Sequence, residues 1–130
     1  MTPRVRRRPA ERIPLMPLRS TAVYPTGVIG VQVGMPETLE MLATHPEPGL
    51  VVAVVVAPGE PEDPIDPRTL DKIAVRARVS DRLNLPGGTV QATVQGLERV
   101  RLSEVRATDG YLTALAQPVT EVQAEEGEAP

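Results

Sequence analysis

Alternating apolar and polar positions in the second half of the chain predict β-strands. Every second residue within residues 73–79 is apolar, and Arg76 and Arg78 lie between them, as in a strand with one face in water. Residues 89–95 repeat this alternation, with valine and alanine on one face and threonine and glutamine on the other. Residues 86–88, Pro-Gly-Gly, join the two runs and supply a fixed φ followed by two residues that tolerate positive φ. We therefore expect a β-hairpin here.

The β pattern continues beyond this hairpin. Gly96 interrupts the alternation and predicts a bulge or bend, after which residues 99–103 resume as a strand. Residues 108–110, Thr-Asp-Gly, predict a turn. A last strand then spans residues 111–117 and ends at Pro118.

Three more strands are predicted in the first half of the chain. Residues 13–18 form an extended segment in which Pro14 and Pro17 lack amide donors, so we expect it to lie at a sheet edge or to enter a strand, and not to run through the centre of a sheet. Residues 28–33 alternate valine and isoleucine with glycine and glutamine. Residues 50–57 are a continuous run of valine, leucine and alanine, the pattern of a strand that is buried on both faces.

One helix is predicted between the second and third strands. Pro36 suits the first helical position, Glu37 suits the positive end of the helix dipole, and Leu39 and Leu42 lie on one face. Pro46 ends the helix. One helix among short strands indicates a mainly β fold, a compact, mostly antiparallel barrel or sandwich of six or seven strands.

Composition and charge narrow the class of protein. The chain has 130 residues, about one domain, with 41% hydrophobic and 24% charged residues and no cysteine. Four arginines between residues 4 and 8 predict a flexible basic leader over residues 1–11, and four glutamates predict an acidic flexible tail over residues 121–130. The folded domain is then residues 12–120. Without a long apolar run or a secretory signal, we expect a cytoplasmic protein that contacts no membrane.

The sequence offers little catalytic chemistry. It has no phosphate-binding loop, its one lysine is Lys72, and its one histidine, His45, lies in a proline-rich loop. The acidic residues between 60 and 66 lack the spacing of a calcium loop. We expect no catalytic residues, no metal and no cofactor, and hence a protein that is not an enzyme.

Four short segments resemble, in order, the N-terminal domain of Lon proteases. Residues 13–25, Ile-Pro-Leu-Met-Pro-Leu-Arg-Ser-Thr-Ala-Val-Tyr-Pro, are similar to the family's opening Pro-Leu-x-Pro-Leu-Arg-Asn-Thr-Val-x-Phe-Pro. Residues 30–34 lie where the family has its second strand, although Met35 stands in place of the usual arginine. Residues 50–57 are similar to its valine-rich strand. Residues 85–100 are similar to its Leu-Pro-Asp-Gly-Thr and Val-Glu-Gly-Leu-x-Arg segments.

The resemblance implies a PUA-like β-barrel with a binding role. Relatives place this domain before an ATPase module and a serine–lysine protease module, and it is thought to engage unfolded or damaged substrates and to support hexamer assembly. The implied partners are therefore apolar segments of such proteins and the Lon-type modules or hexamer. As the contact surface we predict five residues of the first strand and the turns that follow: Leu15, Met16, Tyr24, Pro25 and Met35. Leu15 and Met16 also fit a place in the core.

Two other functions stay open. Arg76, Arg78, Arg99 and Arg101 form a basic patch if their strands are neighbours, and together with the PUA relationship this suggests a nucleic-acid-binding module. The near absence of aromatic residues argues against it, since such sites usually stack bases on aromatic side chains. The chain also fits a stand-alone adaptor or inhibitor of a Lon-type protease.

Overall fold

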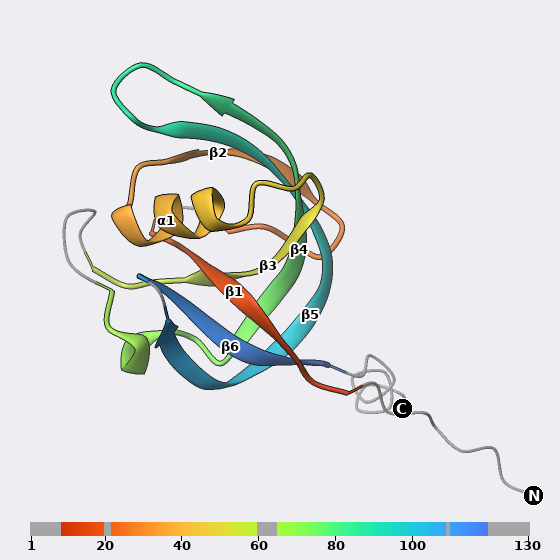
Figure 1. Cartoon of the computed structure of the whole chain (residues 1–130). Helices are drawn as coiled ribbons and strands as arrows, with labels where there is room; N and C mark the ends of the chain where they lie inside the picture. The colour runs from red at the N-terminus through yellow and green to blue at the C-terminus, as the bar shows by residue number, and fades with distance from the viewer. Residues whose placement is uncertain (1–8, 20–21, 60–64, 109, 120–130) are drawn as a thin grey trace, which may run out of the picture.

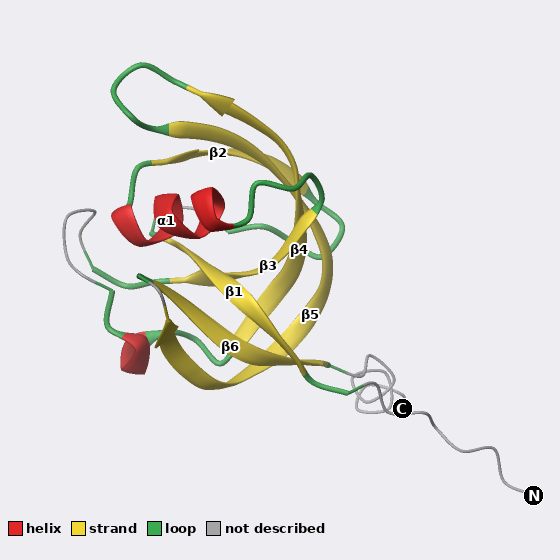
Figure 2. Cartoon of the chain, in the orientation of Figure 1, coloured by secondary structure: helices red, strands yellow, loops and turns green. Residues whose placement is uncertain are grey.

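The computed structural model describes residues 9–19, 22–59, 65–108 and 110–119. These residues form six strands, one α-helix and one short 3₁₀-helix, η1 (Figures 1 and 2). The elements are β1 Glu11–Leu18, β2 Val28–Val33, α1 Pro36–Thr44, β3 Leu50–Val56, η1 Pro67–Thr69, β4 Ile73–Asn84, β5 Val90–Thr108 and β6 Tyr111–Pro118. Residues 1–8 of the expected leader and all of the expected tail lie outside the described residues.

The strands form one sheet that closes on itself. Its order is β2-β5-β4-β3-β1-β6, and β5 also pairs with β6, so β5, β4, β3, β1 and β6 make a ring (Figure 1). Within the described residues, β2 pairs with β5 alone. All pairs are antiparallel except β1 with β3. The predicted mainly β fold with one short helix is confirmed.

The fifth and sixth predicted strands are one long, bent strand, β5. The pair Arg76–Glu98 is followed by Ala77–Gly96, so Leu97 is an extra residue on β5. This is the bulge that Gly96 predicted. One extra residue moves the side chains that follow it to the other face of the strand. The even-numbered residues Ala92 and Val94, before the bulge, therefore lie in one apolar core, and Val100 and Leu102, after it, lie in another. The described residues therefore form six strands.

Two apolar cores lie on opposite sides of the wall made by β1 and β3. The ring core fills the inside of the ring and takes residues from all five of its strands; among them are Leu15, Ala53, Ala74, Val100 and Ala114. The helix-side core lies under α1 and β2; among its residues are Met16, Val31, Met41, Val52 and Val94. Successive residues of β3 alternate between the two cores, which confirms that this strand is buried on both faces. The same division explains why Ala74, predicted on a wet face of β4, is buried.

The prediction that the first strand does not run through the centre of the sheet is wrong. β1 lies between β3 and β6 in the sheet. Its first half, up to Pro14, pairs with β6, and its second half, from Leu15, pairs with β3. In this register each half of β1 has a paired strand on one side only. Pro14 and Pro17 can therefore point their ring nitrogens, which have no hydrogen to donate, to the unpaired side.

The helix α1 is held at its C-terminus by a residue of β4. Pro36 occupies the first turn of α1, and the helix ends at Thr44, before Pro46, as predicted. The guanidinium of Arg82 donates a hydrogen bond to the carbonyl oxygen of Leu42 at 2.7 Å and another to that of His45. A cation at this position satisfies free carbonyl groups and complements the negative end of the helix dipole. Arg82 thus fixes the end of α1 against β4.

Candidate functional site

A tight turn before β2 presents an exposed tyrosine. The amide of Gly27 donates to the carbonyl oxygen of Tyr24 at 2.8 Å, with Pro25 at the second turn position, where its fixed φ fits. The amide of Gly96 in turn donates to the carbonyl oxygen of Gly27 at 2.8 Å. The turn therefore lies directly on the bulge of β5, and its backbone packs where a side chain of residue 96 would be.

Large apolar side chains are exposed at and just after this turn. Tyr24 is 72% exposed and Val28, the first residue of β2, is 61% exposed. Pro25 is half-buried beside them, and Met35, just beyond the other end of β2, is half-buried at the start of α1. We call Tyr24, Pro25, the exposed β2 residues Val28, Gly30 and Gln32, and Met35 the β2 surface. Exposed apolar side chains make this surface the candidate site for contact with another molecule.

The structure separates the five predicted contact residues. Tyr24 and Pro25 lie together at one end of β2, and Met35 follows the other end. Leu15 and Met16 are 1% and 0% exposed, in the ring core and the helix-side core respectively, so neither offers surface to a ligand in this structure. The prediction did not include Val28. Its place in the alternation with Gly30 and Gln32 was the signal that it lies on the wet face of its strand.

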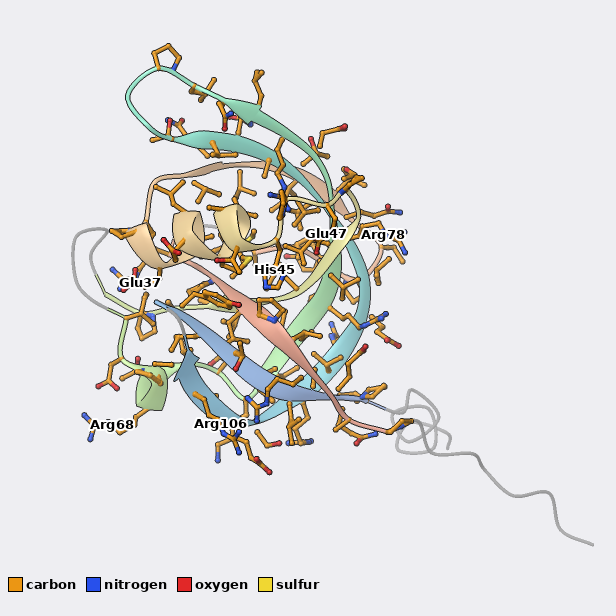
Figure 3. All side chains as sticks on the ribbon, viewed as in Figure 1. Glu37, His45, Glu47, Arg68, Arg78 and Arg106 are labelled. Carbon is orange, nitrogen blue, oxygen red and sulfur yellow. The ribbon has the colours of Figure 1, made fainter. Side chains whose placement is uncertain are left out.

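The histidine contributes to packing. Nε2 of His45 lies 3.0 Å from the hydroxyl oxygen of Tyr111, and the two rings meet edge to face. Nδ1 of His45 lies 3.6 Å from a carboxylate oxygen of Glu47, and Figure 3 shows both residues beyond the end of α1. These contacts link the end of α1 to β6. They do not include a nucleophile such as a serine or lysine.

The described part of the acidic loop also shows no metal site. Residues 60–64 lie outside the described residues. Asp66 accepts hydrogen bonds from the side chain and amide of Arg68, which lower the pKa of the Asp66 carboxyl. Among the residues that the structure describes, no three histidine, aspartate or glutamate side chains gather in a way that would hold a metal ion.

Comparison with known proteins decides the family. Residues 12–129 match the family described as the ATP-dependent protease La (LON) substrate-binding domain. The chain belongs to this family. The Lon protease of Flavobacterium johnsoniae is 27% identical over 117 residues, which are 90% of this chain and 14% of that protein. The Lon protease of Xanthomonas oryzae pv. oryzae is 32% identical over 120 residues, 91% of this chain and 14% of that protein. This Lon-family chain thus spans about one seventh of the length of these curated relatives.

Solved structures show the same fold. The N-terminal domain of a Mycobacterium avium complex Lon protease has a TM-score of 0.60 and 18% identity, over 91% of this chain and 63% of that one. A Lon N-terminal domain protein from Xanthomonas campestris has a TM-score of 0.54 and 19% identity, over 85% of this chain and 62% of that one. The family resemblance noted in the sequence is confirmed. No helix in the described part of this Lon-family domain has the length and apolar character needed to cross a membrane.

The four arginines of the predicted basic patch do not form one surface in this Lon-family domain. In the β4–β5 register, Arg99 lies opposite Val75, and Arg76 lies opposite Glu98. Because paired residues share a face and successive residues alternate, Arg76 and Arg99 project from opposite faces. Arg76 is also paired with Glu98 at 3.5 Å and with Glu11 at 3.7 Å.

Proposed function

We propose that this domain recognises exposed apolar segments of unfolded or damaged proteins for a cytoplasmic, ATP-dependent Lon-type protease. The observation that supports the proposal is the exposure of Tyr24 and Val28, two large apolar side chains that lie four residues apart around the turn before β2 and are 72% and 61% exposed. Water penalises exposed apolar area, so a partner that covers both side chains gains free energy. The family description of the matched domain as substrate-binding supports the same role.

The chemistry of the β2 surface suits varied partners. Tyr24 provides a large, rigid face, and Met35 provides a flexible thioether side chain that adapts to different shapes. No charged side chain occurs in β2. Such a surface recognises the apolar character of a segment and not one specific sequence, which is what capture of damaged proteins requires.

The proposed role is binding without catalysis. ATP hydrolysis and peptide-bond cleavage would belong to the ATPase and protease modules, with which the domain would assemble in a hexamer. The nucleic-acid alternative is less well supported, because the arginines on which it rested lie on opposite faces of the sheet.

Replacing Tyr24 by aspartate tests the proposal. We expect Tyr24→Asp to weaken binding of a reduced and alkylated, permanently unfolded polypeptide by about tenfold or more, because the charge would have to lose water on contact. Ile73→Asp is the matched control, since Ile73 is 41% exposed and lies opposite Arg101, away from β2. Its affinity should equal that of the parent. Fluorescence titration measures all three proteins. If Tyr24→Asp binds as tightly as the parent, or the parent does not bind, the proposed function is wrong.

A further inference from the structure

The free edge of β2 carries unpaired backbone groups whose positions follow from its register. Val28 lies opposite Gln95, and the amide of Gly96 donates to the carbonyl oxygen of Gly27. In an antiparallel ladder this bond makes Val28–Gln95 a pair that exchanges no hydrogen bonds, so the amide and carbonyl of Val28 point away from β5. The same alternation applies to Gly30 and Gln32. Three residues thus direct their donors and acceptors to the edge of β2 opposite β5.

The same three residues also lie on the exposed face of β2. Val28, Gly30 and Gln32 are the exposed residues of β2, whereas Val31 and Val33 are buried. Within the described residues, no second strand pairs with this edge. Exposed strand edges bind other extended chains unless prolines, charges or bulges protect them, and β2 contains none of these.

Two other one-sided strand segments carry charged side chains. Beyond Val79, β4 pairs only with β5 among the described residues, and it carries Asp81 and Arg82 there. Beyond Ser103, β5 pairs only with β6, and it carries Glu104 and Arg106. A strand that adds to an edge removes water from it, which penalises nearby charges. The uncharged edge of β2 therefore suits an uncharged strand, and the charged segments do not.

We propose that the free edge of β2 binds the backbone of an extended, uncharged segment of an unfolded polypeptide by β-strand addition. The inference rests on the proposed function and specifies how that surface holds its substrate. Backbone hydrogen bonds with Val28, Gly30 and Gln32 give affinity that does not depend on which uncharged side chains the segment carries, and Tyr24 and Val28 add apolar contact at one end. A charged segment would not fit, because its charges would lose water when the strand covers the edge. A folded segment would not fit, because its backbone groups are already hydrogen-bonded.

A proline at the centre of the edge tests this inference. The amide of Gly30 points away from β5, so Gly30→Pro removes an edge donor without removing a ladder hydrogen bond. We expect Gly30→Pro to bind the unfolded polypeptide about tenfold more weakly, since it loses a donor and places its ring against the incoming strand. Gly30→Ala is the control. Its added Cβ lies 3.1 Å from the Nε2 atom of the flexible Gln91 side chain, and its affinity should stay within about twofold of the parent.

Amide hydrogen exchange of the unaltered domain gives a second readout that does not depend on how the variant folds. On addition of the polypeptide, the amides of Val28, Gly30 and Gln32 should exchange more slowly, while those of Ile29 and Val31 are already protected by β5. Unchanged exchange at the three edge amides in the bound state, or parent-like affinity of Gly30→Pro, would overturn the inference. The inference would also be overturned if the three edge amides were protected to the same degree at high domain concentration without polypeptide, because a second copy of the domain would then occupy the edge. If Tyr24→Asp weakens binding but the edge amides do not respond, only the inference fails and the proposed function stands.

Discussion

Gly96→Ala is expected to lower the free energy of unfolding by about 3 kcal/mol or more, an unusually large effect for one methyl group. A Cβ at residue 96 would overlap the carbonyl oxygen of Tyr24 and lie 3.0 Å from its carbonyl carbon and 3.2 Å from that of Pro25. These are backbone atoms, so no side chain can rotate away. The turn before β2 must move, and the hydrogen bond from Gly96 to Gly27 is strained or lost.

Urea unfolding measures this loss, and a second glycine near β2 supplies the control. A Cβ on Gly34 would make only an ordinary contact, 3.4 Å from the Thr89 methyl carbon, and the residue does not have positive φ. We expect Gly34→Ala to change the free energy of unfolding by no more than about 1 kcal/mol. Gly96→Ala should also weaken polypeptide binding, measured where the variant is still folded, because the displaced turn carries Tyr24. Equal stability of the two variants would show that the turn does not pack on the bulge in this way.

Met16→Ala is expected to lower the free energy of unfolding by about 2–5 kcal/mol, through lost apolar burial and the cavity that remains. Met16 is fully buried in the helix-side core and lies opposite Val54 of β3. Since its side chain offers no surface, the affinity of the folded variant for unfolded polypeptide should stay within about twofold of the parent.

Met35→Ala is the matched comparison, because Met35 belongs to the β2 surface and is only half-buried. We expect it to lose about 1 kcal/mol of stability or less and to bind polypeptide more weakly. Thermal unfolding and titration of both variants separate packing from contact. A Met16→Ala variant of unchanged stability and reduced affinity would place Met16 in the contact surface instead of the core.

Local features of the fold could be predicted from the sequence because their causes are local. The Pro-Gly-Gly hairpin needs only its turn residues, and Gly87 and Gly88 do adopt positive φ. The start of α1 follows from Pro36, and its end before Pro46 follows from the lack of a proline amide. The run of residues 50–57 predicted a strand buried on both faces, since a strand between two cores needs continuous apolar side chains; Val56, at its end, is 42% exposed.

Features that depend on distant partners could not be predicted in this way. The central position of β1 depends on a change of partner from β6 to β3, which no pattern within residues 13–18 encodes. The division of the four arginines between two faces depends on the register of β4 with β5. At the candidate site, the turn chemistry around Pro25 was visible in the sequence. Leu15 and Met16 are both buried because β1 lies between two apolar cores. Two adjacent apolar residues in the sequence do not reveal that a strand has a core on each face.

Photocrosslinking tests most directly the central claim that the β2 surface captures unfolded chains. A photoreactive amino acid is placed at position 24 in one protein and at position 73 in another, and each is illuminated with a polypeptide in its folded or its unfolded form. The account predicts strong crosslinking from position 24 to the unfolded form, little to the folded form, and little from position 73 to either. Equal crosslinking from the two positions, or none from position 24 to the unfolded form, would contradict it.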